Sequence, residues 1–222
     1  MGTHKGNASR SRRRRAAAGL LVGGLLTSVH PGVTTAVPRS GLAGTAGTGP
    51  NGFLEALRAD GPSQDRRGAR DLYGDLIGSW EGEVVDHLES GAPRRQSAEF
   101  HFAWVLEGRA VQDLWIVPAR SDRGAVAAAA GNRYGTTLRV YHPAIDAWRI
   151  TWINPVTGSE NHLVGRRVGS QIVQTGSDAE GRLVRWVFVE IREDAFHWRG
   201  ESSPDGGQSW TCETEFFGHR KR

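Results

Sequence analysis

One carboxylate interrupts an otherwise apolar run of the sequence. Asp113 lies in AVQDLWIVP, where Leu114, Trp115 and Ile116 follow it. A carboxylate that is buried without a partner costs several kcal/mol, so Asp113 requires an arginine or a hydrogen-bond donor. Arg139, in TLRVY, is the arginine that the following strand offers. The two residues are therefore the first candidates for a fixed polar group inside a site.

Three residues are candidates for acid–base chemistry: Asp113, His101 and His162. Carboxylates and imidazoles move protons near neutral pH when their surroundings tune their pKa values. In such a site Tyr141 or Arg139 would polarise an oxygen of the substrate. The same residue types also suit the solvent-facing side of a strand, which is polar by default, so both interpretations stay open.

Tryptophan is frequent, with eight residues in a chain of 222. Large rings fill protein cores, and the tryptophans fall in runs that predict strands. Together they also suit a partly aromatic cavity for a small molecule. We therefore expect a ligand to contact the following residues: Arg139, Tyr141, Trp152, Asn154, Trp186 and Trp198.

The sequence carries no pattern of a metal site. Cys212 is the only cysteine, which excludes an intramolecular disulfide and a zinc site built from cysteines. Neither H-x-H nor HExxH occurs, and G-x-S-x-G and the P-loop pattern are absent as well. We therefore expect no metal and no cofactor. One alternative stays open, a heme in the barrel with His162 or His197 as its axial ligand.

The elements that must position these residues are strands. From Trp80 onward, short runs rich in Val, Ile, Thr, Trp and Phe alternate with period two and are separated by turn residues. Stretches such as SDAEGR and SPDGGQ suit hairpin turns. The predicted strands cover residues 79–86, 97–106, 109–117, 134–141, 146–153, 159–165, 170–175, 182–190, 194–201 and 208–217.

About ten sequential strands have to protect their edges. A closed up-and-down barrel does so within this length, and a two-sheet sandwich is the alternative. No strand is followed by a crossover helix, which argues against α/β classes. The predicted fold class is therefore all-β, an antiparallel up-and-down β-barrel after a short N-terminal helix, with a long loop at residues 119–132 on one rim.

The stretch LIGSWEGEV is similar to the first strand of lipocalin and calycin barrels. In that pattern a Gly-x-Trp follows a short helix, and the Trp closes one end of the barrel beneath a late basic residue. Gly78 and Trp80 match the pattern, and Arg220 or Arg199 would supply the basic residue. Residues 72–220 also resemble an uncharacterised bacterial lipocalin-like family in GRAVQDLWIVP, YGTTLRVYHPAIDAWRITWINP and FHWRGESSPDGGQSW. The resemblance implies a calycin-type barrel and does not imply one particular reaction.

The stretch SSPDGGQSW resembles the Asp-box hairpin that sialidases and other β-propellers repeat. A propeller of about six blades does not fit in 222 residues, and one copy is not a repeat. We therefore predict a hairpin between the last two strands. Asp205 would accept hydrogen bonds from the turn, Gly206 and Gly207 would supply positive φ, and Trp210 would pack beneath it.

The chain divides into three parts. Residues 1–36 join the basic stretch SRSRRRR to the apolar run AAAGLLVGGLL, which is the order of an export signal. The apolar run is too short to cross a bilayer, so we expect no stable membrane insertion. Residues 37–68 have the composition of a linker, and residues 69–222 form the predicted barrel domain. Export would make the protein secreted or periplasmic, whereas a disordered basic tail would suit a cytoplasmic protein.

The positive charge is concentrated at the N-terminus. Residues 1–40 hold seven basic residues and no acidic residue, and the rest of the chain carries 21 basic and 24 acidic residues. A mildly acidic body lacks the basic surface that nucleic acids require, so we expect no nucleic-acid partner.

Three functions agree with these patterns. The first is binding of a small hydrophobic or aromatic molecule in a Trp-rich barrel cavity. The second is a cofactor-free enzyme, a cyclase, isomerase or hydratase, with Asp and His acid–base groups in the same cavity. The third is a structural or partner-binding barrel with a filled interior, and a homodimer stays open in each case. A cavity of several hundred Å³ with convergent ionisable groups would favour the first two.

Overall fold

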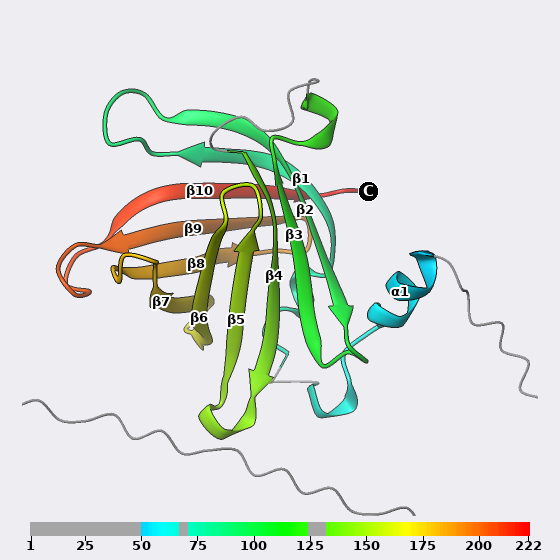
Figure 1. The fold of residues 1–222 in the computed structure, drawn as a ribbon. Coiled ribbons are helices and arrows are strands. Elements are labelled where there is room, and N and C mark those ends of the chain that lie inside the picture. The colour runs from blue at the N-terminus through cyan, green and yellow to red at the C-terminus, as the bar shows by residue number, and fades with distance from the viewer. Residues whose placement is uncertain (1–49, 67–70, 124–131) are drawn as a thin grey trace, which may run out of the picture. The chain divides into compact units, whose positions relative to one another are not determined.

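A computed structural model describes residues 50–66, 71–123 and 132–222 (Figure 1). Its strands are β1 (Gly78–Asp86), β2 (Arg94–Val105), β3 (Ala110–Val117), β4 (Arg133–His142), β5 (Ala147–Asn154), β6 (Ser159–Val168), β7 (Gln171–Ser177), β8 (Leu183–Ile191), β9 (Ala195–Ser203) and β10 (Thr211–Arg220). The helix α1 (Pro50–Leu57) precedes them, and short 3-10 turns lie at Gln64–Arg66, Gly74–Leu76, Arg120–Asp122 and Pro143–Ile145. The predicted export signal, residues 37–49 and 67–68 of the predicted linker, and residues 124–131 of the rim loop lie outside the described residues.

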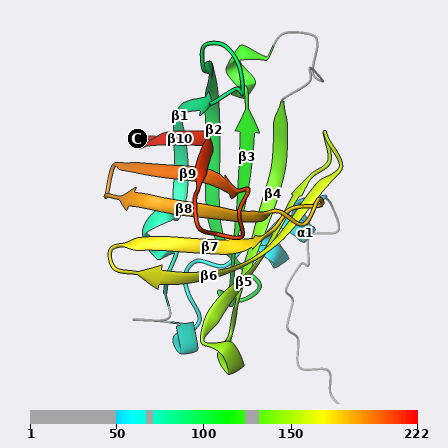
Figure 2. The same cartoon turned by 90° about the vertical axis from the view of Figure 1, so that its left-hand side faces the viewer.

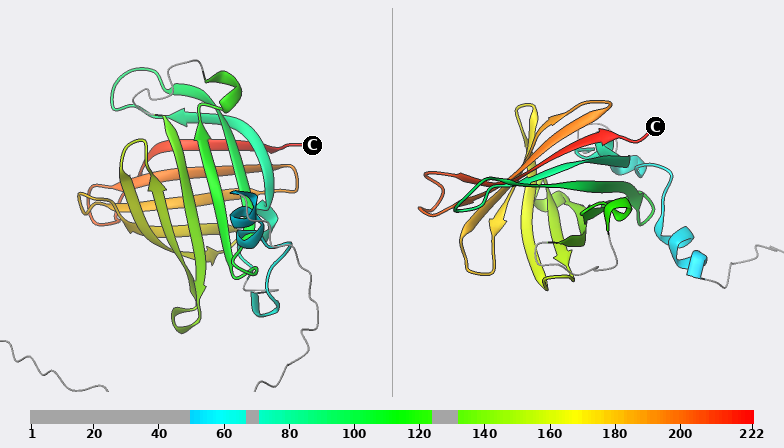
Figure 3. Two further views of the ribbon diagram at one scale, coloured as in Figure 1. Left: turned by 45° about the vertical axis from the view of Figure 1, so that its right-hand side comes forward. Right: turned by 90° about the horizontal axis from the view of Figure 1, so that it is seen from above.

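The ten strands close into one barrel. Each strand pairs antiparallel with its neighbours along the chain, and β10 pairs with β1 to complete the ring. The strands β3, β4 and β5 run across the direction of β8, β9 and β10 on the opposite wall (Figures 1 to 3). A closed ring leaves no sheet edge unpaired. The prediction of an all-β, up-and-down antiparallel barrel is therefore confirmed, and the sandwich alternative is wrong.

All ten predicted strands exist, and their ends differ by a few residues. The strand β2 begins three residues earlier than expected because its pairing with β1 continues from Ser97 to Arg94, which lies opposite Asp86. The strand β10 begins three residues later because the preceding residues form the turn. Continued pairing with a neighbour and a turn thus set these two strand ends, while the period-two pattern predicted the strand cores.

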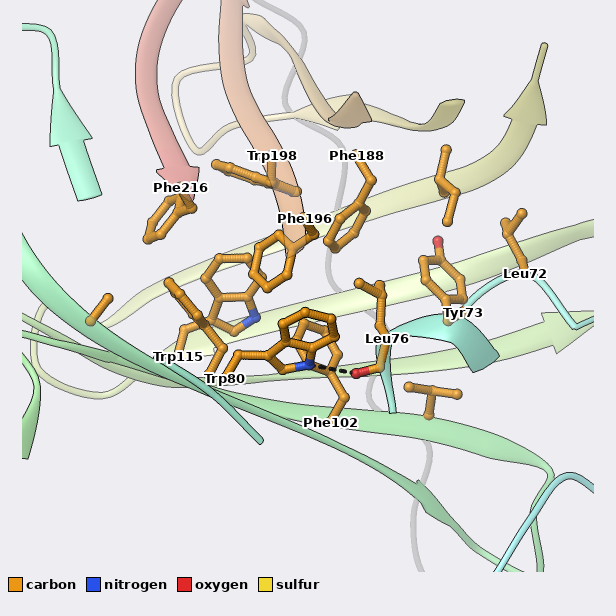
Figure 4. Packing of buried hydrophobic residues seen from close by; sticks show 14 of the residues in the cluster. Leu72, Tyr73, Leu76, Trp80, Phe102, Trp115, Phe188, Phe196, Trp198 and Phe216 are labelled. Atoms are coloured by element: carbon orange, nitrogen blue, oxygen red, sulfur yellow. Dashed lines mark hydrogen bonds between the residues drawn. The ribbon is translucent and has the colours of Figure 1, made fainter. Parts of the chain in front are cut away.

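Aromatic rings make up much of the buried core cluster (Figure 4). Phe100 meets Trp115 with ring centroids 4.8 Å apart and Phe196 with centroids 5.3 Å apart, both edge to face. Trp115 contacts Phe216 in the same way at 4.7 Å. Edge-to-face pairs stabilise a core beyond the burial of their area, which explains why the aromatic residues alternate so regularly in these strands.

Trp80 closes one end of the barrel. Its side chain is fully buried, and its indole Nε1 donates a hydrogen bond of 2.8 Å to the carbonyl of Leu76 (Figure 4). The guanidinium of Arg220 lies 4.0 Å from the centroid of the Trp80 ring and donates to the carbonyl of Ile77 at 2.7 Å. Arg220 is thus the basic residue over the tryptophan, whereas Arg199 forms an ion pair with Glu201.

The segment before β1 packs against the barrel at two places. The Leu57 carbonyl at the end of α1 accepts the Leu106 amide at 2.9 Å, so the helix joins the turn between β2 and β3. Directly before β1 lies the 3-10 turn Gly74–Leu76, and Asp71 Oδ1 accepts the Gly74 amide at its start at 2.7 Å. Tyr73, the residue before that turn, is fully buried in the core of the barrel.

The stretch SSPDGGQSW is the hairpin between β9 and β10. Asp205 Oδ1 accepts the Ser209 amide at 2.8 Å, and the Asp205 carboxylate also accepts the Ser209 hydroxyl. The Ser209 hydroxyl and amide lower the pKa of Asp205 to about 2. Gly206 and Gly207 have φ values of 72° and 95°, which favour glycine. The prediction of a turn is confirmed at this position.

A second carboxylate ties the rim loop to the barrel. Glu99 on β2 accepts a bond from Arg120 Nε at 2.9 Å and another from Arg120 Nη2 at 2.7 Å. Its side chain is only 10% exposed. The hydrogen bonds from Arg120 lower the pKa of Glu99 to about 2, against an ordinary value of 4.5.

We expect Glu99→Gln to weaken the fold and flatten its acid profile. A depressed pKa stabilises the folded state above the unfolded-state pKa, and this contribution is lost as the pH falls from about 4.5 to about 2. Because Arg120 is half exposed to water, we expect a loss of about 1–2 kcal/mol at pH 6. Urea titrations at pH 6, 4, 3 and 2 measure it. The control Glu55→Gln on α1 should match the unsubstituted protein, and an unchanged profile for Glu99→Gln would contradict the prediction.

Candidate functional site

The strand register decides which side chains point into the barrel. Phe102 on β2 pairs with Asp113 on β3, Asp113 pairs with Thr137 on β4, and Thr137 pairs with Trp152 on β5. Side chains alternate between the two faces of a strand, so residues aligned in one row share a face. This row points inward and sets one carboxylate among aromatic rings.

The inward-facing rows enclose a cavity of about 130 Å³. Six strands contribute its lining: Trp115, Arg133, Thr137, Arg139, Trp152, Trp186, Trp198, Thr214 and Phe216. Four of these residues are tryptophans and two are arginines, so the cavity has apolar walls and two cationic groups. Its volume is smaller than the several hundred Å³ that would favour ligand binding or catalysis over a structural barrel with a filled interior.

The tryptophans form a continuous wall. Trp186 meets Trp152 with ring centroids 6.4 Å apart and Trp198 with centroids 5.8 Å apart, both edge to face. Trp198 then contacts Phe216 at 4.9 Å. Rings that hold one another at steep angles keep fixed positions, so the cavity is largely formed in advance.

The buried Asp113–Arg139 ion pair lies beside the cavity, and Arg139 is the member of the pair that lines it. Arg139 Nη1 donates to Asp113 Oδ2, and the two side chains are 2% and 0% exposed. The Thr137 amide donates to Asp113 Oδ1 at 2.8 Å, which satisfies the second carboxylate oxygen. The carboxylate is thus held by a charge and a backbone donor, as a buried carboxylate requires.

Further polar groups surround Arg139. Gln174 Oε1 accepts a bond from Arg139 Nε at 3.4 Å and another from the Tyr73 hydroxyl at 3.3 Å. Gln174 Nε2 is buried and has no partner among the described residues. The Tyr73 ring lies 4.9 Å from the Arg139 guanidinium, and burial raises the pKa of Tyr73 well above its usual range. The phenol therefore stays protonated and acts as a donor.

A second ionic cluster borders the cavity. Asp86 Oδ1 accepts a bond from Arg133 Nη2 at 2.5 Å, and Asp86 Oδ2 accepts one from Arg94 Nη2 at 2.8 Å. The Thr214 hydroxyl donates to Asp86 at 2.9 Å. Burial would raise the pKa of Asp86, but these bonds, with Arg133 first, bring it below its ordinary value. The Arg133 guanidinium also lies 5.4 Å from the Phe216 ring, which orients it along the aromatic wall.

Comparison with known proteins identifies the fold. No protein-family model and no curated protein matches the sequence. A crystal structure of Rv2717c from M. tuberculosis is similar, with 17% sequence identity, a TM-score of 0.50, and coverage of 69% of this chain and 98% of that chain. The S-type phycobiliprotein lyase CPES from Guillardia theta has 10% identity, a TM-score of 0.47, and coverage of 72% and 99%. These neighbours are calycin-like barrels.

At 17% identity the likeness to Rv2717c shows the barrel fold and nothing finer. Across the residues that the structure describes, no helix has the length and apolar character needed to cross a membrane.

The structure places four of the six predicted ligand contacts at the cavity: Arg139, Trp152, Trp186 and Trp198. The other two, Tyr141 and Asn154, do not line it. The Tyr141 hydroxyl donates to Asp146 in the connection to β5. Asn154 Oδ1 accepts the Val156 amide at 3.1 Å at the end of β5. Both side chains are engaged at the connections that flank β5.

The three predicted acid–base residues do not share one site. Asp113 points into the barrel, whereas His101 and His162 lie on the outer face. His101 Nδ1 is 3.0 Å from the Ser79 hydroxyl, and the His162 side chain is 71% exposed, with Nε2 2.9 Å from Glu160. Each histidine follows an inward-facing residue along its strand, so the alternation turns it outward. The barrel wall therefore separates Asp113 from both imidazoles.

Neither candidate heme ligand lines the cavity. His162 lies outside the barrel, and His197 stacks on Phe217 on the outer face with ring centroids 4.5 Å apart. His197 Nε2 is 2.9 Å from Glu215 Oε1. The arrangement therefore does not support a heme that either histidine would bind inside the barrel.

Five lining residues lie outside the predicted set: Trp115, Arg133, Thr137, Thr214 and Phe216. Trp115 and Thr137 are each two positions from a predicted site residue, so the period-two pattern contained the signal for them. Arg133 stands one residue before the predicted start of its strand. A bulge between Cys212 and Thr214 changes the alternation in β10, and a simple period-two pattern does not foresee it.

Proposed function

We propose that the barrel binds a small, flat aromatic molecule that carries one anionic or hydrogen-bond-accepting group. The observation that supports this proposal is the lining of the cavity, four tryptophans together with Arg133 and Arg139. Binding sites for small molecules are typically apolar with a few convergent polar groups. Aromatic walls would hold the faces and edges of a ring, and the arginines would fix its orientation.

The volume limits the ligand. A cavity of about 150 Å³ lined by apolar side chains accepts benzene, and this cavity measures about 130 Å³. One aromatic ring therefore fits without rearrangement. A larger ligand has to extend out of the cavity or displace side chains from its wall.

The charges favour an acceptor on the ligand. A guanidinium carries five N–H donors, and the bonds from Arg139 to Asp113 and Gln174 use two of them. Arg133 is also donating to Asp86, and Arg94 shares that carboxylate. Three arginines thus face only two carboxylates, those of Asp86 and Asp113, at the cavity and its border. One positive charge is left for a carboxylate or phenolate of the ligand. Binding is favoured over acid–base catalysis because the cavity holds no imidazole.

A fluorescence titration tests the proposal. Benzoate and toluene serve as a matched pair of one-ring probes, and quenching of the cavity tryptophans reports binding. We expect saturable quenching by both, with tighter binding of benzoate because of the arginines. The absence of saturable quenching by either probe would contradict the proposal.

A cavity-filling variant makes the test specific. Thr137→Leu places additional methyl groups in the cavity and should abolish quenching while the melting temperature stays within a few degrees. The matched control Thr151→Leu adds the same groups on the outer side of β5, where Thr151 contacts His162, and should leave binding unchanged. Unchanged binding to Thr137→Leu would place the probe elsewhere.

A further inference from the structure

An ordered group of polar side chains lies on the outer wall where β1, β10 and β9 meet. Glu215 on β10 pairs with Val85 of β1 on one side and with Arg199 of β9 on the other. Residues two positions along a strand share a face, so His87 and His197 flank Glu215. Each imidazole Nε2 lies 2.9 Å from a different oxygen of the Glu215 carboxylate.

A bulge brings the only cysteine of the chain to the same place. The pairing of β10 with β9 shifts between Cys212 and Thr214, so one residue is inserted there. Without the shift, Cys212 and Glu215 would point to opposite faces because they are three positions apart. With it, Cys212 pairs with Glu201 and faces outward like Glu215. Bulges commonly re-aim a side chain in this way at functional sites.

We propose that His87, Cys212 and Glu215 form a binding site for a borderline-soft divalent cation such as Zn²⁺. One donor atom from each residue lies within 4.8 Å of the other two. Thiolate, imidazole and carboxylate are the three donor types that zinc takes in proteins. The sequence gives no sign of this set, because its members come from two distant strands and a bulge.

The geometry requires only small adjustments. Zinc bonds of about 2.0–2.3 Å would replace the direct hydrogen bond between His87 and Glu215. Burial first and the Glu215 charge second raise the pKa of the Cys212 thiol, so binding releases the thiol proton to solvent as the sulfur–zinc bond forms. His87 is exposed, so a water molecule can take the fourth position. Arg199 also faces this region, and its charge is paired with Glu201 at 3.2 Å.

His197 would orient the carboxylate rather than bind the ion. Its Nε2 already holds Glu215 Oε1, which leaves Oε2 on the side of His87. Burial would raise the pKa of Glu215, but hydrogen bonds from His87 and His197 lower it, so the carboxylate is ionised for binding. Hydrogen-bond partners of this kind fix the ligands of metal sites, and their loss costs roughly 10–100-fold in metal affinity.

Cobalt and zinc titrations of the reduced, untagged full chain test the site. We expect one Co²⁺ per chain, with the thiolate-to-cobalt charge-transfer absorption that only a sulfur ligand produces, and stoichiometric displacement by Zn²⁺. The affinity for Zn²⁺, measured against a competing chelator, should fall most in Cys212→Ser and His87→Gln. It should fall roughly 10–100-fold in His197→Gln.

A matched control separates this site from general binding by surface histidines. His162→Gln removes an exposed histidine that also contacts a glutamate, and it should leave the zinc affinity unchanged. A cobalt complex without the thiolate absorption, or an unsubstituted protein that binds no Zn²⁺, would overturn the proposal. Unchanged affinity in Cys212→Ser would do the same.

Discussion

Asp113→Asn alone is expected to lower the free energy of unfolding by about 3–5 kcal/mol. The substitution leaves Arg139 as a buried cation without its counter-charge, and such a group is far more costly than a pair that is absent altogether. The two side chains are 0% and 2% exposed, so water cannot take the place of the lost partner. Urea unfolding at pH 7 measures the loss.

A double-mutant cycle measures the interaction energy between Asp113 and Arg139 apart from their other contacts. Asp113→Asn combined with Arg139→Met should cost less than the sum of the two single changes, with a coupling energy of about 1–3 kcal/mol. The matched control is the ion pair between Glu83 and Arg95, which also joins neighbouring strands but lies on the exposed outer face. We expect a coupling energy of about 0–1 kcal/mol there. A coupling near zero for Asp113 and Arg139 would show that the pair is not a structural unit.

Trp80→Ala is expected to cost about 3–5 kcal/mol, and Trp210→Ala about 1 kcal/mol. Trp80 is fully buried and lies between Phe196 and Arg220, so its removal leaves a cavity at the closed end of the barrel. Trp210 follows the turn and contacts Arg185, with the guanidinium 4.2 Å from its ring.

Denaturant titrations of the two tryptophan variants give the comparison directly. Both substitutions remove the same side chain, so the difference reports burial and not residue type. Equal losses would mean that Trp80 is not the residue that closes the barrel. A change in the slope of the titration would instead indicate a change in the unfolded state.

The fold could be predicted because its signals are local. Alternation with period two, turn sequences such as SPDGGQ and the Gly78-x-Trp80 pattern each concern only a few neighbouring residues. The turn at Asp205 is held by hydrogen bonds between its own side chain and groups a few residues away, so a short stretch of sequence was enough to predict it. Ten such strands in sequence leave few arrangements that protect every edge, which is why the barrel follows.

The site could be predicted only in part because it depends on register. A strand pattern gives two faces and does not say which face is inside, so His101 stayed a candidate beside Asp113 on sequence grounds. The pairing of Phe102 with Asp113 decides the question, and it turns His101 outward. Tyr141 and Asn154 have the right residue types, but their local hydrogen bonds at the ends of β5 engage them instead.

The order of strands around the ring has a consequence for how the chain folds. Nine of the ten strand pairs join neighbours along the sequence, and the tenth joins β1 to β10. Closing a long loop costs more conformational entropy than closing a hairpin, so the hairpins can form before the ring does. The contacts of Trp80 with Arg220 and of Asp86 with Thr214 belong to this last pair. The β1–β10 seam is therefore where we expect the native barrel to open first, ahead of any hairpin, when amide hydrogens exchange with solvent.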